Sequence, residues 1–353
     1  MRKKAMVSGI TGQLGYYLAK LLIEKDYDVI GLYRRTATRS FDRLHDFLNL
    51  PNFELVPCDI TDATSVFRVV DKYKPEEIYN TAAQSYVHVS FTEPAHTFNV
   101  DTIGVLNFLE AIRILKTDTK FITMSTSEMF GKSVSYQGLE NFNGCDVGLR
   151  HNTFIKDAPE GVELFQDEET PFFPQSPYGI AKLASHHLVR LYREAYNIFA
   201  CSNINYNFES PHRGKEFVTR KITDYVAQIA TGRIANEKLP LGNLDAKRDW
   251  GFAGDVAKAT WLTLQQDNPD EYVVSTMKTH SIKDLCKVAF GCLDLDYEDY
   301  VVVDPKFFRP AEVDYLLGDS TKIRQKLGWN PSTSFEDLIQ YMVDSDIMIY
   351  NGL

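Results

Sequence analysis

The sequence predicts an α/β protein in which a doubly wound parallel sheet carries a smaller α/β lobe at the C-terminal end. Three observations lead to this fold class: a glycine-rich turn near the N-terminus, a regular alternation of strand-like and helix-like segments, and a length of 353 residues with 44% hydrophobic residues. Such a chain can bury a large core and is expected to form two domains, or one domain with a substantial lobe. Strands that alternate with helices favour a parallel sheet covered by helices.

Charge, cysteine content and hydropathy narrow the class of protein. The net charge of −10 argues against a nucleic-acid-binding surface. The five cysteines contain no C-x-x-C pair, and neither they nor the eight histidines show metal-ligand spacing, so we expect reduced, structural thiols and no metal site. No segment approaches the roughly 20 apolar residues that span a bilayer. We therefore expect a cytoplasmic protein with no membrane or nucleic-acid partner.

The glycine-rich turn follows the first expected strand, Lys4–Ser8, and precedes an amphipathic helix that runs to about Lys25. Three glycines spaced by two residues allow a tight turn and the close approach of a pyrophosphate to a helix N-terminus, where free N–H groups and the dipole favour an anion. The spacing alone is a modest signal, and a plain glycine turn is the alternative, but its place between a strand and a helix favours a dinucleotide site. The residues expected at this site are Gly9, Thr11, Gly12, Gln13, Leu14 and Gly15.

Two arginines follow the second expected strand, Asp28–Tyr33. NAD-selective sites usually carry an acidic residue at this position, where it binds the ribose 2′-hydroxyl. Arg34 and Arg35 suit a 2′-phosphate instead, so the sequence favours NADP over NAD. The alternative is a solvated basic turn.

The third and fourth expected strands also end in residues that suit a cofactor. Residues 53–58 lead to Asp59 and Ile60, an expected adenine contact, and Glu77–Asn80 leads to a run of small residues. Small side chains let the backbone pass close to a cofactor, although a close helix–strand contact explains them equally well. The cofactor contacts expected in this run are Thr81, Ala82 and Ala83.

Helical patterns over residues 63–73 and about 99–116 complete the alternation and lead to an apolar strand that begins at Phe121. Its end carries small hydroxyl residues and one carboxylate, where open α/β sheets place their ligands. Thr126 and Glu128 are therefore candidate reactive-centre residues. A Ser/Thr turn with a solvated acid is the alternative.

The pattern breaks over residues 132–170, which contain polar, glycine-bearing and apolar pieces without a clean period. A structureless loop of this length is unusual in a compact domain, so we expect a functional flap, an oligomer contact or a small subdomain. The sequence does not choose among these three.

A long helix opens at Pro177 and carries Tyr178 and Lys182. The i, i+4 spacing stacks the two side chains on one helical face, so the ammonium can favour the phenolate and let Tyr178 act as a base near neutral pH. Tyr16 and Lys20 have the same spacing, but they lie in the helix after the glycine turn, so we assign them to structure.

Later segments suggest how the chain divides. A helix over residues 255–264 and a strand over 272–275 are expected to return to the cofactor sheet, and alternating short pieces from about Ser281 suggest a smaller lobe. The expected division is a dinucleotide-binding domain over 1–205, with the 132–170 insertion and a returning segment at 252–277, and a mainly substrate-binding lobe over 206–353.

The glycine turn, the Ser/Thr strand end and Tyr178-x-x-x-Lys182 together resemble the extended short-chain dehydrogenase/reductase superfamily, whose sheet is of the Rossmann type. Further segments resemble GDP-mannose 4,6-dehydratases, and the ten-residue segment 241–250 is the most specific of them. The matching segments run from about residue 4 to 341 and leave 132–170 uncovered. They are 83–85, 125–128, 176–179, 217–221, 241–250 and 309–314.

The resemblance implies a redox-neutral elimination on a GDP-hexose with NADP. Tyr178 would remove the O4 proton as hydride leaves C4, with Lys182 lowering the pKa of Tyr178 and Thr126 donating a hydrogen bond to O4. The resulting ketone acidifies C5–H, so Glu128 would abstract the C5 proton and assist loss of the C6 hydroxyl as water. Return of the hydride to C6 would then give a 4-keto-6-deoxy sugar nucleotide.

The resemblance also implies a GDP-sugar pocket. Its cationic members suit the diphosphate and Glu312 suits ribose hydroxyls. Alternatives remain for two of them, because Arg248 could pair with Asp245 or Asp249, and Lys221 could lie on a solvated helix face. The substrate-binding residues implied are Ser85, Thr126, Glu128, Asn207, Val218, Lys221, Gly242, Arg248, Arg309 and Glu312.

Because of two departures from the family pattern, the sequence does not decide which sugar the substrate carries. Phe208 replaces a histidine and His212 replaces an arginine. GDP-mannose, GDP-manno-heptose and GDP-N-acetylglucosamine are the substrates considered. A sugar-nucleotide 4-dehydrogenase or epimerase and a catalytically silent nucleotide-sugar-binding regulator are the competing functions.

The family forms dimers and tetramers, and in tetramers an arginine-bearing loop after the second strand reaches a neighbouring cofactor site. Residues 35–43 resemble that loop only in part. We therefore expect self-association and leave dimer and tetramer as alternatives.

Overall fold

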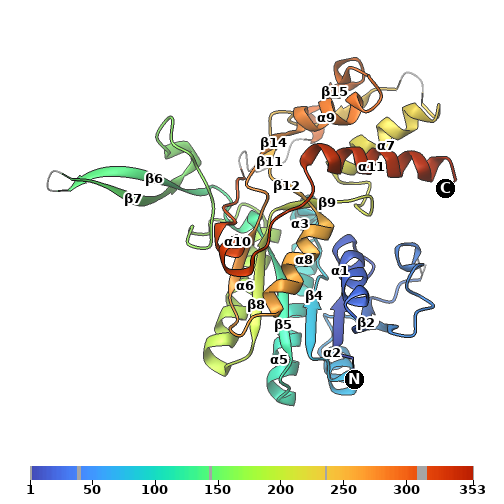
Figure 1. The fold of residues 1–353 in the computed structure, drawn as a ribbon, viewed down its shortest axis with the longest axis vertical. Coiled ribbons are helices and arrows are strands. Elements are labelled where there is room, and N and C mark those ends of the chain that lie inside the picture. The colour runs from blue at the N-terminus through green and yellow to red at the C-terminus, as the bar shows by residue number, and fades with distance from the viewer. Residues whose placement is uncertain (1, 38–40, 143–144, 235–236, 308–315, 353) are drawn as a thin grey trace.

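The computed structural model describes residues 2–37, 41–142, 145–234, 237–307 and 316–352, with the backbone alone for 139–142 and 145–147. Seven parallel strands form its central sheet, in the order β13-β8-β5-β4-β1-β2-β3 (Figure 1). This arrangement confirms the expected fold class. The strand order reverses between β1 and β4, the point at which open α/β sheets bind ligands. The strands are β1 (Lys4–Ser8), β2 (Asp28–Tyr33), β3 (Phe53–Pro57), β4 (Glu77–Asn80), β5 (Lys120–Thr126), β8 (Ala200–Asn205) and β13 (Glu271–Val274).

Helices cover both faces of the sheet. Side chains alternate across a strand, so Ala5 and Val7 of β1 pack into one core cluster with α1 and α8, and Met6 packs into a second with α2, α5 and α6. All three side chains are fully buried. The covering helices are α1 (Gln13–Glu24), α2 (Ala63–Tyr73), α5 (Gly104–Leu115), α6 (Pro177–Tyr196) and α8 (Ala253–Leu264).

The helix expected over about 99–116 is interrupted. Asn99–Ile103 form a π-helical turn, after which α5 continues as a regular α-helix. A π turn places one extra residue in a helical turn and often lies at a functional site. Because one inserted residue changes the apolar spacing little, the sequence pattern reads as an uninterrupted helix.

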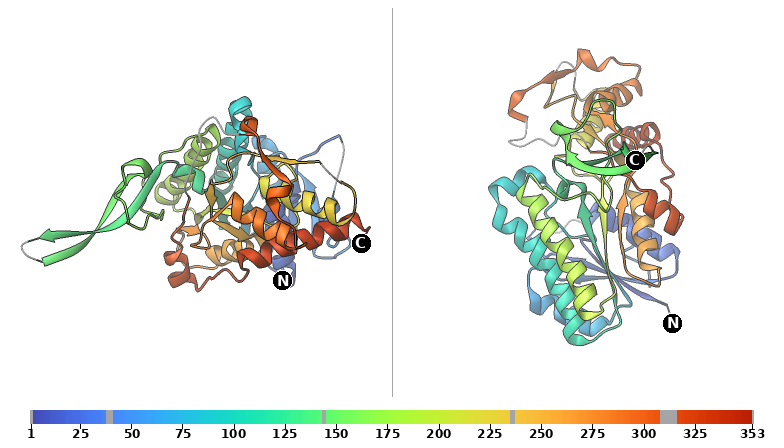
Figure 2. Two further views of the ribbon diagram at one scale, coloured as in Figure 1. Left: turned by 90° about the horizontal axis from the view of Figure 1, so that it is seen from above. Right: turned by 90° about the vertical axis from the view of Figure 1, so that its left-hand side faces the viewer.

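The insertion after β5 is largely a long β-hairpin, formed by β6 (Ser133–Phe142) and β7 (Cys145–Phe154), which projects away from the body of the molecule (Figures 1 and 2). Its base is held to the body. Ser135 exchanges two backbone hydrogen bonds with Phe165, and Arg150 forms an ion pair with Asp167.

A smaller lobe lies beyond the carboxyl ends of the strands (Figure 1). Its core is a third apolar cluster built on α7 (Val218–Ala230), α9 (Ile282–Gly291) and α11 (Phe335–Tyr350). None of the helices in the described ranges is both long and apolar enough to cross a membrane. The remaining elements are α3 (Val87–Thr92), α4 (Pro94–Phe98), α10 (Thr321–Leu327), β9 (Asn207–Glu209), β10 (Leu239–Leu241), β11 (Lys247–Arg248), β12 (Trp250–Phe252), β14 (His280–Ser281) and β15 (Val301–Val303).

Candidate active site

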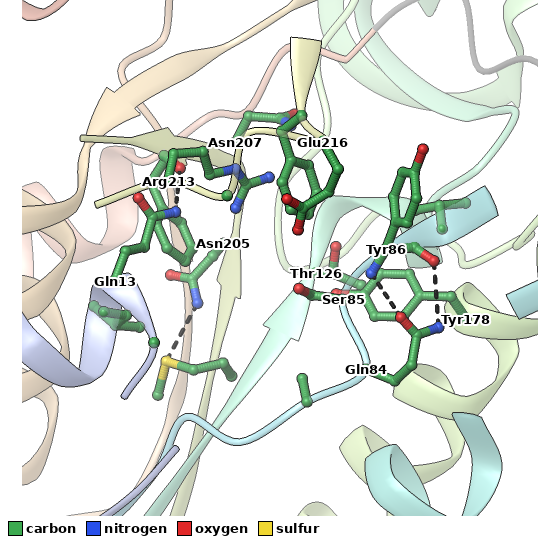
Figure 3. Close-up of a pocket in the computed structure, with 18 of the residues that line it drawn as sticks. Gln13, Gln84, Ser85, Tyr86, Thr126, Tyr178, Asn205, Asn207, Arg213 and Glu216 are labelled. Carbon is green, nitrogen blue, oxygen red and sulfur yellow. Dashed lines mark hydrogen bonds between the residues drawn. The ribbon is translucent and has the colours of Figure 1, made fainter. Parts of the chain in front are cut away.

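A cleft of about 1200 Å³ lies between the carboxyl ends of the strands and the smaller lobe (Figure 3). Most residues expected from the sequence line it. Arg35 does not, and Arg309 and Glu312 lie outside the described residues. The expected residues that line the cleft are Gly9, Thr11, Gly12, Gln13, Leu14, Gly15, Arg34, Asp59, Ile60, Thr81, Ala82, Ala83, Ser85, Thr126, Glu128, Tyr178, Lys182, Asn207, Val218, Lys221, Gly242 and Arg248.

The glycine turn leaves no room for side chains. Gly9 has φ +66°, and a Cβ there would lie 2.7 Å from the backbone nitrogen of Ala82. A Cβ on Gly15 would lie 2.4 Å from the carbonyl oxygen of Gly9. Helix α1 begins directly after Gly12 with no side-chain cap, so its first N–H groups are available to an anion. These features fit the pyrophosphate of a dinucleotide.

The small residues after β4 pack against the glycine turn. Thr81 donates a hydrogen bond from Oγ1 to the carbonyl oxygen of Ser8 at 2.6 Å, and the backbone nitrogen of Ala82 lies 3.4 Å from Ser8 Oγ. These bonds tie the ends of β1 and β4 together beneath Gly9. Close packing therefore accounts for the small residues, and it also shapes the cofactor side of the cleft.

Basic residues after β2 lie at the far end of the glycine turn. Arg34 lines the cleft and Arg35 does not, because successive residues leaving an extended strand point to opposite sides. The structure adds Arg43, which the sequence analysis missed: it lines the cleft and donates from Nη1 to the carbonyl oxygen of Thr11 at 2.8 Å. The signal was present, since Arg43 belongs to the arginine-bearing loop after the second strand.

Two local features bring Glu128 and Tyr178 to the same region. Thr126 ends β5 and accepts a hydrogen bond from the backbone nitrogen of Glu128 at 3.3 Å, which closes a short 3₁₀ turn. Ser176 caps α6 by accepting from the backbone nitrogen of Gly179 at 3.0 Å. A Cβ on Gly179 would lie 2.9 Å from the carbonyl oxygen of Glu128, so glycine lets the start of α6 pack against this turn.

Burial dominates the electrostatics of the Tyr–Lys pair. It raises the pKa of Tyr178, an effect that Asp101 and Glu128 reinforce and that a hydrogen bond with Thr126 opposes. Burial also lowers the pKa of Lys182, against the attraction of Asp101. The Lys182 ammonium lies 5.9 Å from the centroid of the Tyr178 ring and donates to the carbonyl oxygen of Met124 at 3.0 Å. The two residues share a face of α6, but nearby charges and hydrogen bonds must offset desolvation before Tyr178 can ionise.

Asp101 is a buried acid that the sequence analysis did not identify. It lies on the π-helical turn and accepts a hydrogen bond from the backbone nitrogen of Gln84 at 2.8 Å. Burial raises the pKa of its carboxyl to about 6, and the Lys182 ammonium acts in the opposite direction. No polar pattern in the sequence distinguishes it from a surface aspartate on a helix.

The lobe side of the cleft is cationic. Lys221 donates to the carbonyl oxygen of Pro240 at 2.6 Å, and burial together with Lys306 lowers the pKa of its ammonium. Lys306 lines the cleft and was also missed by the sequence analysis. Arg248 is buried and donates to the carbonyl oxygen of Lys247 at 2.8 Å.

Two of the alternatives considered above can be compared with the structure. Asp249 accepts hydrogen bonds at both carboxylate oxygens, from Thr276 and Met277. Lys221 is partly buried and lines the cleft. Within the described residues, no group of three or more His, Cys, Asp or Glu side chains is arranged to hold a metal ion.

The two departures from the family pattern lie against α1. The carbonyl oxygen of Phe208 accepts from Gln13 Nε2 at 2.9 Å, and the rings of His212 and Tyr16 have centroids 4.2 Å apart. Both residues line the cleft, but on the side of the glycine turn. This placement weakens the inference that they select the sugar.

Comparison with known proteins gives one consistent family. The model of the family described as GDP-mannose 4,6 dehydratase matches residues 6–142 and 160–342, which leaves residues 143–159, with the whole of β7, unmatched. The chain is 44% identical over 356 residues to GDP-mannose 4,6 dehydratase 2 of Arabidopsis thaliana, covering 98% of this chain and 87% of the relative. It is 39% identical over 371 residues to the Homo sapiens GDP-mannose 4,6 dehydratase, covering 98% and 92%.

Solved structures share the fold. UDP-glucose 4-epimerase of Thermotoga maritima, with UDP-glucose, superposes with a TM-score of 0.79 at 22% identity, covering 99% of this chain and all of that one. DesIV, a dTDP-glucose 4,6-dehydratase of Streptomyces venezuelae with NAD and TYD bound, gives 0.79 at 21% identity, covering 97% and 96%. RMD of Pseudomonas aeruginosa, complexed with NADPH, gives 0.75 at 19% identity, covering 98% and 99%.

Proposed function

The chain belongs to the GDP-mannose 4,6-dehydratase family, and from this membership we propose that it converts GDP-mannose to its 4-keto-6-deoxy derivative with loss of water. The observation that carries the proposal is the carboxylate of Glu128 in the same cleft as Thr126 and Tyr178. An oxidation at C4 needs a base for O4–H, whereas elimination also needs a carboxylate near C5.

Each catalytic residue has a separate task in this reaction. Tyr178 accepts the O4 proton while Thr126 donates a hydrogen bond to O4. Glu128 takes the C5 proton and returns a proton to the C6 hydroxyl, which leaves as water. A nicotinamide cofactor held at the glycine turn and at the strand ends would supply the hydride acceptor for C4 and the hydride donor for C6. C5 then regains a proton that originates from solvent, so the net change is the loss of one water.

Tyr178 acts only as its phenolate, and burial opposes that form. Before the substrate binds, the hydrogen bond that the Thr126 hydroxyl donates to Tyr178 lowers the pKa of Tyr178, as does the positive charge of Arg213. The same hydroxyl turns to O4 once the substrate is bound. We propose that Lys182, held on the same face of α6, adds positive charge when the cleft is filled. The phenolate is then stabilised mainly where the substrate is bound.

We further propose that the nicotinamide cofactor is NADP. Arg34 and Arg43 both line the cleft after β2, and a guanidinium binds a phosphate through paired hydrogen bonds. Relatives of the same fold bind NAD in some cases and NADPH in others, so the fold does not decide between them. The two arginines support the phosphorylated form.

We also propose that the enzyme self-associates and is located in the cytoplasm. Ile114 of α5 and Leu191 of α6 are 52% and 53% exposed, and the two helices lie side by side on the outside of the molecule (Figure 2). Such a surface suits a dimer in which α5 and α6 pack against the same helices of a second copy. Free thiols at Cys58, Cys201 and Cys286 are consistent with a reducing compartment.

Mass spectrometry of reactions with several GDP-sugars tests the function. The purified chain with NADP should convert GDP-mannose to a product lighter by one water, and it should leave GDP-manno-heptose and GDP-N-acetylglucosamine largely unchanged. Loss of water from one of those sugars alone would transfer the proposal to that substrate. Oxidation or inversion at C4 without water loss would identify a dehydrogenase or epimerase, and binding without turnover a regulator.

A further inference from the structure

Asn205 carries a buried amide in the cleft to which neither the sequence nor the family resemblance assigned a task. It is the last residue of β8 and pairs with Thr126, the last residue of β5. It lines the cleft, although only 4% of it is exposed. Figure 3 shows Asn205 on the wall of the pocket, between Gln13 of α1 and Thr126.

The amide of Asn205 makes little use of its hydrogen-bonding capacity within the protein. Its Nδ2 lies 3.4 Å from Met124 Sδ, and a thioether sulfur is a weak acceptor. Its Oδ1 is buried and has no hydrogen-bond partner among the residues that the structure describes. Leaving a buried polar atom unpaired costs free energy, and most such atoms in proteins have a partner. We therefore expect a ligand in the cleft to supply the missing donor.

A second asparagine on the same face of β8 does not have this access. Asn203 lies two residues earlier, accepts a hydrogen bond from Thr263 Oγ1 at 3.1 Å and also has an unpaired amide nitrogen. It is fully buried and does not line the cleft. Of the two asparagines, only Asn205 is placed to contact a ligand.

The place of Asn205 indicates which part of a ligand it contacts. The glycine turn before α1 fits the pyrophosphate of a dinucleotide, and the proposed hydride transfer takes place beside Thr126 and Tyr178. The nicotinamide half of the dinucleotide therefore has to extend from the glycine turn to these two residues, along the wall that carries Asn205. A nicotinamide bears a carboxamide, and its NH₂ group is the kind of donor that Asn205 Oδ1 lacks.

We propose that Asn205 Oδ1 accepts a hydrogen bond from the carboxamide NH₂ group of the bound nicotinamide and thereby fixes the orientation of the ring beside Thr126. The inference rests on the proposed function, because it takes a nicotinamide dinucleotide as the ligand. A fixed ring suits the proposed reaction, in which one hydride leaves C4 and returns to C6 of the same sugar, because both transfers need close alignment of the reacting atoms. Asn205 is thus a cofactor-binding residue.

Calorimetric titration with cofactor analogues tests the contact. Asn205→Leu replaces the amide by an apolar side chain of similar size and should weaken NADPH binding about 3- to 10-fold, the usual loss for a neutral hydrogen bond. The reduced 3-acetylpyridine analogue of NADPH has a methyl group in place of the NH₂ group, so its affinity should change less than twofold. ADP-ribose 2′-phosphate lacks the nicotinamide, and its affinity should change equally little.

Two controls accompany this titration. NADH and its acetylpyridine analogue should show the same contrast, because the contact does not involve the 2′-phosphate. Asn268→Leu changes an exposed asparagine outside the cleft and should leave every affinity unchanged.

An unchanged NADPH affinity in Asn205→Leu, or equal weakening of NADPH and its acetylpyridine analogue, would overturn the contact. Weaker binding of GDP-mannose with unchanged binding of NADPH would overturn it too, because the amide would then contact the sugar. Failure of the unsubstituted protein to bind either reduced dinucleotide would instead contradict the proposed function.

Thermal melting separates the contact from a structural role. An unpaired buried oxygen does not stabilise the ligand-free protein, so Asn205→Leu should leave its Tm unchanged or raise it. The increase in Tm that NADPH causes should be smaller in the variant than in the unsubstituted protein. A lower Tm of the ligand-free variant, with an undiminished increase on adding NADPH, would overturn the proposal, because Asn205 would then stabilise the fold through a buried water.

Discussion

At the scale of single residues, the proposal of a dehydration rather than a simple oxidation depends on Glu128. The sequence located it, because a carboxylate that follows a buried strand by two residues lies at the ligand-binding edge of a parallel sheet. The structure adds the reason it lies near Tyr178, which is the close packing of Gly179 against the backbone of Glu128. The local sequence pattern therefore located Glu128, whereas the proximity of Glu128 to Tyr178 depends on tertiary packing.

Other site residues were beyond prediction from local pattern. Arg213 is placed by Arg220 and Asp346, which come from two helices far apart in the sequence. Asp101 is buried on the π-helical turn, whereas a single acid in a helical segment of sequence is normally expected to face solvent. Arg34 and Arg35 looked equivalent because the sequence did not show which of the two points into the cleft.

Thr126→Val should change the pH dependence of the reaction. The hydrogen bond from Thr126 lowers the pKa of Tyr178, so its loss raises that pKa, and the active phenolate forms only at higher pH. The acidic limb of the kcat/KM profile should move upward, with about a 3- to 15-fold loss at neutral pH. Steady-state assays across pH measure this. Thr92→Val, at an exposed threonine of α3 outside the cleft, should not move the limb, and an unmoved limb in Thr126→Val would contradict the assigned role.

Arg34→Gln should weaken NADPH binding by roughly tenfold or more, because it removes a charged donor from the 2′-phosphate. NADH lacks that phosphate, and its affinity should stay within about twofold. Fluorescence titration of the two cofactors measures both. Arg35→Gln is the comparison, since Arg35 does not line the cleft, and its effect on NADPH should be smaller. Equal loss of NADH and NADPH in Arg34→Gln would show that the arginine does not contact the 2′-phosphate.

At the scale of elements, the parallel strands and their helices follow directly from the sequence, and the segment after Gly131 does not. Residues 132–170 lack the alternation typical of a half-buried strand because only the base of β6, at residues 133–135, is buried among the described side chains of the hairpin, while the rest of the hairpin projects from the body. The pairing of β6 with β7 is specified by backbone hydrogen bonds, which any sequence without many prolines can make. The structure shows that much of this segment is a hairpin, and its role as a flap, an oligomer contact or a small subdomain stays a prediction.

Shortening the hairpin tests its role. Gly138 pairs with Leu149, so residues 139–148 can be replaced by an Asn-Gly turn that keeps the register of the remaining strands. The contacts of Ser135 and Arg150 at the base are retained, so kcat and the melting temperature should change little, within about twofold and a few degrees. Enzyme assays and thermal melts measure this.

The same variant separates the alternatives for the insertion. A large loss of kcat/KM with unchanged oligomeric state would identify a flap over the substrate. A change of oligomeric state would identify a contact with another subunit. Either result would contradict the expectation that the projecting part is dispensable.

At the scale of the whole molecule, the cleft depends on two bodies of structure that are held together across the chain. Gln13 of α1 donates to the carbonyl oxygen of Phe208, and Ser210 donates to Gln13 Oε1 at 2.8 Å. The glycine turn is thus hydrogen-bonded to the loop that carries Arg213. The sequence predicted a cofactor domain and a lobe, but these bonds join residues nearly 200 positions apart and leave no local pattern.

Leu191→Asp should disrupt self-association. The charge would lie on the exposed apolar face of α5 and α6, where packing against a second copy would bury it at high cost. Light scattering after size-exclusion chromatography should show the chain as a dimer or tetramer and the variant as a smaller species. Ile349→Asp adds the same charge to an equally exposed isoleucine of α11 and should leave the mass unchanged. A monomeric unchanged protein, or an unaltered mass in Leu191→Asp, would contradict this interface.

The reaction of GDP-mannose in deuterium oxide, followed by nuclear magnetic resonance and mass spectrometry, tests the central claim most directly. The protein with NADP should release one water per turnover and place solvent deuterium at C5 of the product. Glu128→Gln should bind GDP-mannose with little change but lower kcat by about 10²- to 10⁴-fold, the usual contribution of a general base. Turnover by Glu128→Gln at the original rate, or a product that keeps its C5 hydrogen and its C6 oxygen, would contradict the account.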